Sequence, residues 1–409
     1  MTSGRDFVVI SSIDWDFLWQ TPQEIACRLA RAGNRVLFFE TTGVRTPRLG
    51  DARRIVKRIA KWTRAAASRG VREVAPDVYV CSPLVLPPVT QHWQRALNQS
   101  LLVPLVLSSV RKLRMSDAML WTFLPTDTTL DLLRAMATPQ SAVVYHCISD
   151  FTRLASNPVR VAASEQELLR TSDLVLAMCS RLAQHCRRWA NNVHVLPPGV
   201  DLTRFTPDDD GPGQKSVPLS DAALLQTLPR PVIGYVGGLH RHVDVGLLVQ
   251  AILARSEWSW VFVGPRQSDV DALARLPNVH LLGRRPHHEL AKYIDVFDVC
   301  IVPYVLNSFT ETVVPIKISE YLAMGKPVVS TAMPIVSELN GGSEDAIIEA
   351  APGADGFIFA IERALSQASD VAMRERRRAV AAQHDWDQQF GRAVSLLDAV
   401  LRHREAGRA

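Results

Sequence analysis

Residues 315–329 read PIKISEYLAMGKPVV, and this stretch describes a short helix that ends at a buried strand. Pro315 suits the first turn of a helix, because the N–H that proline lacks would have no partner there. Gly325 can adopt the left-handed conformation that closes a helix, and Pro327 prevents the helix from continuing. The two valines that follow favour a strand. The pattern predicts a helix-to-strand turn of an α/β domain.

The predicted helix carries two charged side chains, Lys317 and Glu320, three residues apart and therefore on one face. Its N-terminus presents backbone N–H groups and a partial positive charge, an arrangement that favours an anion such as a phosphate. An ordinary helix between two strands would show the same pattern. This segment alone therefore leaves a structural role open.

Outward from this stretch, apolar runs of strand length alternate with helical segments along most of the chain. The predicted strands are residues 7–13, 35–39, 78–81, 119–123, 142–146, 174–178, 232–236, 258–263, 279–282 and 299–302, and predicted helices include 22–32, 101–113 and 165–170. The alternation predicts an α/β protein with two Rossmann-like, doubly wound domains.

The chain has 409 residues, which exceeds one ordinary core and fits two or three domains. A Pro- and Gly-rich stretch at residues 207–217 interrupts the alternation, as a domain boundary does. The predicted parts are a first domain at residues 1–203, a linker at 204–228, a second domain at 229–383, and a C-terminal helix at 384–409.

These motifs resemble the GT-B glycosyltransferases, in particular family 4 and its relatives. The helix at residues 315–329 is similar to the family's donor helix. The sequence PPGVD at residues 197–201, followed by Phe205, resembles the family's interdomain Pro-Asn-Gly-Val-Asp motif. Residues 385–401, with Trp386 near their start, resemble the family's cross-over helix, which returns to pack on the first domain.

The resemblance implies two Rossmann-like domains that face each other across a cleft. It also implies transfer of a sugar from a nucleoside-diphosphate sugar to an acceptor hydroxyl, with retention of configuration, in cell-surface polysaccharide or glycoconjugate synthesis. The acceptor would be a sugar, a lipid-linked molecule or another small molecule. Helix N–H groups and basic side chains can stabilise the departing diphosphate without a divalent ion, so no metal is expected, and no cofactor beyond the nucleotide-sugar co-substrate.

In the resembled family, the helix start holds the donor diphosphate and its glutamate binds the ribose, which here implicates Pro315 and Glu320. The family's second glutamate contacts the donor sugar. Its position is occupied here by Thr312, and Glu311 lies one residue out of register. Both residues are therefore candidates for contacting the sugar.

Other donor-side candidates follow predicted strands, where ligands collect in open parallel sheets. Glycines after residues 232–236 allow close backbone approach to a phosphate, although an ordinary tight turn has the same sequence. Basic residues nearby can neutralise the diphosphate or contact the base, and His242 stands where the family has a lysine. These candidates are Gly237, Gly238, Arg241, Lys317 and Arg284.

The acceptor side is expected in the first domain. Carboxylates and aromatic rings after its first strand suit sugar recognition, since a ring packs on the apolar face of a pyranose. The candidate catalytic residues there are Asp14 and Asp16, and the candidate acceptor-binding residues are Trp15 and Trp19. The aspartates could instead cap the next helix, but Thr21 with Glu24 at capping-box spacing is a better cap.

His146 and Asp150 accompany the end of another predicted strand, residues 142–146. Related enzymes often place a polar side chain in this loop near the reacting anomeric carbon. His146 is therefore a catalytic candidate and Asp150 an acceptor-binding candidate, with a purely structural histidine as the alternative.

Composition indicates a globular protein, with 47% hydrophobic and 21% charged residues. The six cysteines show no metal or thiol-redox spacing and suit a reducing cytosol as small apolar residues. We find neither an apolar run of membrane-spanning length nor a secretory signal, so we expect a cytoplasmic location.

Between residues 45 and 72, ten basic residues accompany a single acidic one. Apolar residues at roughly helical spacing make this segment amphipathic, which suits an anionic membrane surface at the inner face of the plasma membrane. A solvated surface helix is an equal alternative. No nucleic-acid-binding motif accompanies the charge, so nucleic acid is not an expected partner.

Three other functions remain open. A nucleotide-sugar 2-epimerase would share the architecture without an acceptor. A non-catalytic sugar-nucleotide sensor would explain the departures at Thr312 and His242, although Lys317 and Glu320 favour catalysis. A membrane-surface scaffold would use only residues 45–72.

Overall fold

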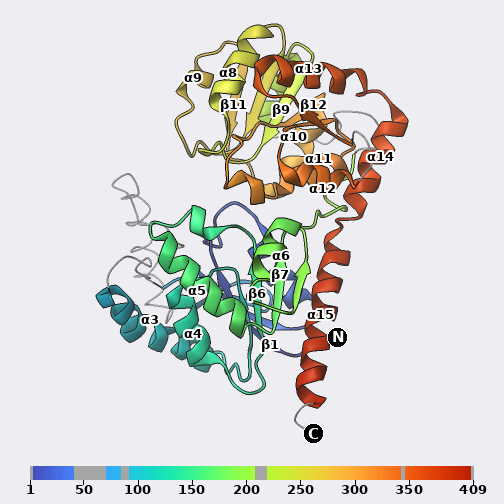
Figure 1. Ribbon diagram of the computed structural model, residues 1–409. Helices are drawn as coiled ribbons and strands as arrows, with labels where there is room; N and C mark the ends of the chain where they lie inside the picture. The colour runs from blue at the N-terminus through green and yellow to red at the C-terminus, as the bar shows by residue number, and fades with distance from the viewer. Residues whose placement is uncertain (1–2, 41–70, 84–91, 208–218, 342–345, 407–409) are drawn as a thin grey trace. The chain divides into compact units, whose positions relative to one another are not determined.

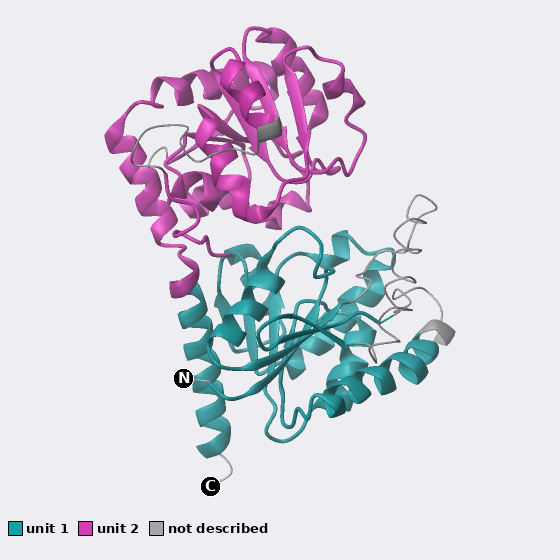
Figure 2. Ribbon diagram, turned by 180° about the vertical axis from the view of Figure 1, so that it is seen from behind, with its two compact units in different colours: residues 1–197, 389–409 teal, residues 198–388 magenta. Residues whose placement is uncertain are grey.

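The computed structural model describes residues 3–40, 71–83, 92–207, 219–341 and 346–406 (Figure 1). The chain divides into two compact units (Figure 2). Unit 1 comprises Met1–Pro197 and Gln389–Ala409, and unit 2 comprises Pro198–Gln388. Each unit is an α/β domain built on its own sheet, which confirms the predicted fold class.

Unit 1 contains an eight-stranded sheet in the order β3-β4-β2-β1-β5-β6-β7-β8. All neighbouring strands pair in parallel except β3 and β4, which are antiparallel. Every residue of β5 and β7 is buried, as expected where a parallel sheet is covered on both faces. The strands are β1 Asp6–Ser11, β2 Arg35–Glu40, β3 Val71–Ala75, β4 Val78–Cys81, β5 Met119–Thr122, β6 Val143–Cys147, β7 Leu174–Ala177 and β8 Val193–Val195.

The helices of unit 1 follow its strands, and α1, for example, contacts β1, β2 and β4. They are α1 Thr21–Arg31, α3 His92–Lys112, α4 Asp127–Met136, the 3₁₀ turn η2 Phe151–Arg153, α5 Pro158–Thr171 and α6 Ser180–Cys186. Helix α3 begins nine residues before the predicted 101–113. The prediction missed this first part because it is mostly polar and lacks a strong apolar stripe. Pro104 lies inside the helix without ending it.

The predicted cap of α1 is wrong. Gln20, not Thr21, is the N-cap, and its backbone N–H donates to Gln23 Oε1 at 3.1 Å. Glu24 pairs instead with Arg28 one turn later, at 2.8 Å. A glutamine three residues after the cap therefore fills the capping-box role that the sequence pattern assigned to Glu24.

Helix α15 (Trp386–Ala406) belongs to both units, as the colour change along it in Figure 2 shows. Near its end, Arg404 Nη2 donates to Asp173 Oδ1 at 2.6 Å. Leu397 and Leu401 are buried. The last turns of α15 are thus held within unit 1.

Unit 2 contains a six-stranded, entirely parallel sheet in the order β11-β10-β9-β12-β13-β14. The strand order reverses between β9 and β12, and such switch points are where α/β sheets bind ligands. The strands are β9 Val232–Val236, β10 Ser259–Val263, β11 Val279–Gly283, β12 Val299–Val302, β13 Val328–Thr331 and β14 Ile347–Ala350. Its helices are α7 Leu219–Thr227, α8 Val245–Ala254, α9 Asp271–Ala274, η3 His287–Glu289, α10 Leu290–Val296, η4 Thr310–Thr312, α11 Ile316–Ala323, α12 Pro334–Asn340, α13 Gly353–Ser366 and α14 Val371–Ala382.

Residues 219–227, predicted as the second part of a linker, form helix α7 of unit 2. The buried Asp221 on this helix accepts two hydrogen bonds from Arg285, at 2.8 and 2.9 Å, and one from the Tyr293 hydroxyl at 2.6 Å. This ion pair lies between residues 64 positions apart, so local composition could not reveal it. These residues thus form a helix within unit 2.

Residues 198–201 of the PPGVD segment and the start of α15 lie together in unit 2. Val200 N–H donates to the His384 carbonyl at 2.8 Å, and Trp386 N–H donates to the Val200 carbonyl at 3.0 Å. Gly199 packs so closely against Trp386 that a Cβ atom would approach its indole to 2.5 Å. A side chain at residue 199 would therefore force this packing apart. Within the described ranges, no helix has the length and apolar character needed to cross a membrane.

Candidate active site

Two glycine turns meet at the carboxyl end of strands β9 and β10. Gly237 follows β9 with φ of +125°, a conformation that residues with a Cβ rarely adopt. Gly264 follows β10, and a Cβ there would overlap the Gly237 carbonyl. A Cβ at Gly238 would lie 2.6 Å from Gln267 Oε1. The two turns thus pack backbone against backbone, and only glycine permits this approach.

Lys317, on the first turn of α11, lies against the Gly237 turn. Its Nζ donates to the hydroxyls of Tyr235 at 2.7 Å and Tyr304 at 2.9 Å. The ammonium also lies 4.0 Å from the ring centroid of Tyr235. A Cβ at Gly237 would approach Nζ to 2.7 Å, so the glycine leaves room for this cation. Tyr235 is the penultimate residue of β9 and Tyr304 follows β12, which places Lys317 at the switch point of the sheet.

Helix α11 is fixed to β9 by a second tyrosine contact. Val236 N–H donates to the Tyr321 hydroxyl at 2.7 Å, and Tyr321 is fully buried. Burial raises the pKa of Tyr235 well above its ordinary value, so this phenol stays protonated and donates to the Gly238 carbonyl at 3.0 Å. The start of α11, with Pro315 as its N-cap, is therefore held beside the glycine turns.

Glu320 occupies the next turn of α11 and is only 5% exposed. Its Oε1 lies 2.7 Å from His287 Nε2, and His287 Nδ1 lies 3.0 Å from Arg204 Nη1. The histidine and the arginine were not predicted as site residues. Their contacts join positions 33 and 83 residues apart, so no local motif points to them.

The segment between β9 and α8 carries three neighbouring polar residues. Arg241 is exposed, and its Nε lies 3.3 Å from His242 Nε2. The His242 ring stacks on Phe309 with 4.4 Å between centroids. Asp244 is the N-cap of α8 and accepts from Leu247 N–H at 2.9 Å. Thus Arg241 precedes the helix and keeps an exposed side chain.

The other predicted donor-side residues lie in loops of unit 2. Arg284 and Glu311 are exposed, and Thr312 Oγ1 donates to the Phe309 carbonyl at 3.1 Å. Arg285, rather than Arg284, anchors its loop through the ion pair with α7. The structure therefore brings Lys317 against Gly237 and places Glu320 one turn later on α11, and the roles of the loop residues stay predictions.

In unit 1, residues 14–19 follow β1, one of the two strands at that sheet's switch point. Trp15 N–H donates to the buried Glu40 Oε1 at 2.6 Å, and the Trp15 ring packs edge-on against Trp19 at 5.9 Å. Trp19 Nε1 donates to Glu24 Oε2 at 2.7 Å. These contacts fix the loop, and the indole N–H of Trp19 is used within the protein.

Asp14 and Asp16 lie in the same loop. Asp16 forms an ion pair with Arg72 at 3.0 Å, in which both side chains are about half exposed (50% and 43%). Exposed pairs of this kind contribute little to stability, so the Asp16 carboxylate can exchange Arg72 for a ligand at small cost. Asp14 contributes its backbone carbonyl to Phe17 N–H at 3.1 Å.

His146 lies inside β6 and is only 1% exposed, so its side chain does not reach the surface of unit 1. Its ring stacks on Phe123 with centroids 5.0 Å apart. Burial lowers the pKa of His146 to about 3, which keeps the imidazole neutral. Asp150 caps η2 by accepting from Thr152 N–H at 3.1 Å. These environments favour structural roles for both residues.

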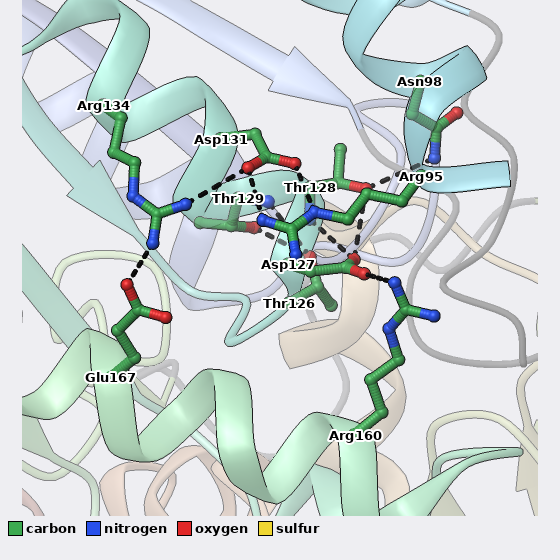
Figure 3. Close-up of polar contacts among 10 residues, drawn as sticks. All are labelled: Arg95, Asn98, Thr126, Asp127, Thr128, Thr129, Asp131, Arg134, Arg160 and Glu167. Carbon is green, nitrogen blue, oxygen red and sulfur yellow. Dashed lines mark hydrogen bonds and ion pairs between the residues drawn. The ribbon is translucent and has the colours of Figure 1, made fainter. Parts of the chain in front are cut away.

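A network of charged residues follows β5 at the start of α4, and sequence reasoning missed it (Figure 3). Asp131 accepts from Arg95 at 2.7 and 3.0 Å and pairs with Arg134 at 3.3 Å. Asp127 pairs with Arg160 at 2.5 Å. Three helices, α3, α4 and α5, supply the arginines. Because the two aspartates are buried, their pairing with arginine offsets the cost of removing carboxylates from water.

The chain is similar in sequence to known glycosyltransferases. Residues 230–367 match the family model described as glycosyl transferases group 1. Over 215 residues, the chain is 31% identical to a putative teichuronic acid biosynthesis glycosyltransferase, TuaH, of Bacillus subtilis, covering 52% of each protein. It is 24% identical to a putative colanic acid biosynthesis glycosyltransferase, WcaL, of Escherichia coli, covering 75% of this chain and 76% of WcaL. The first match spans about half the length of TuaH.

Solved structures share the fold at low sequence identity. Sucrose-phosphate synthase from Thermosynechococcus elongatus matches with a TM-score of 0.71 and 18% identity, covering 98% of this chain and all of that one. HepE of Anabaena, solved in complex with UDP, matches with a TM-score of 0.62 and 16% identity, covering 97% of this chain and all of that one. The chain therefore has the GT-B fold of these solved structures, and residues 230–367, within unit 2, are similar to the glycosyl transferases group 1.

Proposed function

We propose that the chain transfers a sugar from a nucleoside-diphosphate sugar to an acceptor hydroxyl during polysaccharide synthesis. The observation that carries this proposal is the meeting of Lys317, the N-terminus of α11 and the Gly237 turn at the switch point of unit 2. Support also comes from the family match of residues 230–367 and from the polysaccharide-synthesis names of TuaH and WcaL.

The chemistry of such a transfer requires stabilisation of the negative charge that develops on the departing diphosphate. The first N–H groups of an α-helix lack acceptors one turn earlier and carry its partial positive charge. In α11, Ile318 N–H donates to the Pro315 carbonyl at 3.1 Å, so the groups that we propose to face the diphosphate are those of Ile316 and Lys317. Lys317 adds a full positive charge there, held by Tyr235 and Tyr304. These groups supply the electrostatic stabilisation in our proposal, so transfer proceeds without a divalent metal and without a further cofactor.

Arg241 and Arg284, both exposed, are proposed to close over the diphosphate and the base, and Glu311 or Thr312 to contact the donor sugar. Glu320 is proposed to hold the ribose. On the acceptor side, Asp16 is proposed as the carboxylate that receives the acceptor, with Trp15 beside it as an apolar surface. The expected stereochemical outcome remains retention of the anomeric configuration, as in the resembled family.

We propose a cytoplasmic location with peripheral attachment to an anionic membrane. All six cysteines are buried free thiols, which suits a reducing compartment. Residues 45–70 of the basic segment 45–72 lie outside the described residues. The proposed membrane contact of this segment therefore rests on its charge alone. Flotation with anionic liposomes tests it, using wild-type protein and a variant with charge-reversed basic residues between 53 and 64. Equal flotation of the two proteins contradicts the proposal.

A donor screen tests the catalytic proposal. Purified protein is incubated with UDP-, GDP- and ADP-sugars, with and without EDTA, and release of the nucleoside diphosphate is measured. We expect one donor to be turned over slowly by hydrolysis, equally in EDTA, and NMR of the released sugar to report its configuration. Absence of turnover together with nucleotide binding would indicate a sensor, and an altered sugar still attached to its nucleotide would indicate an epimerase.

A further inference from the structure

Glu320 is held by a chain of side chains that starts in the PPGVD region. The Glu320 carboxylate is 7% exposed and lies 2.7 Å from His287 Nε2. On the other side of the ring, His287 Nδ1 lies 3.0 Å from Arg204 Nη1. Arg204 in turn lies 3.5 Å from Asp201 Oδ2, one turn earlier. All four residues belong to unit 2, so this chain lies within one compact domain.

The arginine decides which nitrogen of His287 carries the proton. A guanidinium can only donate hydrogen bonds, so His287 Nδ1 must accept from Arg204 and cannot itself hold a proton. The proton of the neutral ring therefore lies on Nε2, which faces Glu320 Oε1. The Glu320 carboxyl oxygen accepts this hydrogen bond, with 2.7 Å between Nε2 and Oε1.

Packing holds the imidazole in this orientation. Phe205 is 1% exposed, and its ring meets the His287 ring edge-on with 5.5 Å between centroids. Asp201 Oδ1 accepts from Arg204 N–H at 3.2 Å, which ties the arginine to the turn after the PPGVD sequence. The motif residues Asp201 and Phe205 are thus the ones that support the arginine and the histidine.

We propose that His287 is a positioning residue, which Arg204 holds in the Nε2–H tautomer so that Glu320 keeps its orientation toward a nucleotide ribose. One hydrogen bond from His287 occupies part of the acceptor capacity of the carboxylate, and the remaining capacity serves the ribose hydroxyls. This inference rests on the proposed function, because Glu320 is taken to bind a ribose. It adds two residues to the site, neither of which touches the donor in this account.

Nucleotide titrations test the proposal. The nucleoside diphosphate that binds best among UDP, GDP and ADP is titrated by calorimetry, together with its 2′,3′-dideoxy analogue. His287→Asn keeps an acceptor for Arg204 but is too short to donate to Glu320, whereas His287→Gln keeps a donor at the place of Nε2. We expect His287→Asn to weaken binding of the ribonucleotide about tenfold and of the dideoxy analogue less than about twofold.

Three controls make the result specific. His287→Gln should restore most of the ribonucleotide affinity, since the amide donates where the imidazole did. His288→Asn, the same change at the next position, should have no effect because the His288 side chain is 72% exposed. Thermal unfolding of each variant shows whether unit 2 remains folded. Equal loss of affinity for the two nucleotides, or loss for neither, would overturn the proposal.

The tautomer is tested without nucleotide. Nitrogen NMR of the protein labelled with ¹⁵N-histidine should show His287 protonated on Nε2, with assignment by the His287→Gln variant. Arg204→Met should shift this signal toward a mixture of tautomers. A proton on Nδ1 in the wild-type protein would overturn the inference even if nucleotides bind. If no nucleotide binds to the wild-type protein, the proposed function fails and the ribose role of His287 fails with it, whatever the tautomer.

Discussion

A substitution of Lys317 distinguishes a loss of phosphate binding from a loss of folding most clearly. Lys317→Met keeps the length and apolar character of the stem and removes only the ammonium. An ammonium has three donors, and two of them go to Tyr235 and Tyr304. By this count one donor remains for a phosphate oxygen. We therefore expect the variant to fold and to bind a nucleoside diphosphate more weakly.

The magnitude follows from the position of Nζ beside the Gly237 turn. Two unit charges 4 Å apart attract by about 4 kcal/mol at an effective dielectric constant of 20, which is an upper bound for this site. A hydrogen bond to a charged group contributes about 1.5–3 kcal/mol net. We therefore expect Lys317→Met to lose about 2 kcal/mol of binding free energy, which corresponds to about a 30-fold rise in Kd. The stability change should stay within about 1 kcal/mol, because Tyr235 keeps its bond to Gly238.

Calorimetric titration of UDP, UMP and uridine provides the assay, with the matching guanine or adenine set if UDP is not the nucleotide that binds. The loss caused by Lys317→Met should be large for the diphosphate and near zero for the nucleoside. Lys326→Met is the matched control at the other end of α11, where Nζ donates to the Asp295 carbonyl at 2.6 Å. That control should lower stability and leave affinity unchanged. Equal losses for UDP and uridine in Lys317→Met would refute the assignment.

Three further predictions concern the glycine turns, the buried histidine and the division of labour between the units. Gly264→Ala should lower the free energy of unfolding, measured in urea, by about 1–3 kcal/mol and should weaken nucleotide binding, because the added methyl group displaces the facing turn. Gly391→Ala is the control and should have neither effect, because nothing lies within 4 Å of its Cβ. Burial lowers the pKa of His146 to about 3 in the folded protein. As the pH falls below 6.5, His146 therefore binds a proton in the unfolded protein but not in the folded protein. The free energy of unfolding should then fall by about 1.4 kcal/mol per pH unit from pH 6.5 toward 3. His146→Phe should remove this pH dependence and retain activity. Loss of activity with an intact fold would favour the catalytic role. Glu320→Ala should weaken nucleotide binding about tenfold, and Asp16→Ala should lower kcat with unchanged donor affinity; the reverse pattern would show that the two roles are exchanged.

Strands buried on both faces were predictable, because uninterrupted apolar runs mark them in the sequence. Strands β9 and β12, for example, have the predicted bounds. Strand β3 was missed because its VREVA sequence exposes Arg72 and Glu73 at the antiparallel edge of the sheet, where burial does not select apolar residues. The three-residue β8 was too short to give a pattern.

The candidate site was predictable only where a motif is local. The PIKISEYLAMGKPVV stretch carries Lys317 and Glu320 together, so the sequence already pointed to a helix with both charges on one face. It could not show that Lys317 would lie against Gly237, 80 residues away in the chain, or that His287 would meet Glu320. Such contacts depend on the strand order, which no local pattern encodes. For the same reason, the sequence could not show that His146 would be buried and stacked on Phe123.

The central claim is that a diphosphate binds at the start of α11. A crystal structure of the protein soaked or grown with UDP, or with whichever nucleoside diphosphate binds best, tests it most directly. We expect diphosphate density within hydrogen-bond distance of the first N–H groups of α11 and of Lys317 Nζ, with the ribose at Glu320. A nucleotide bound elsewhere in unit 2, with these groups contacting only the protein, would contradict it.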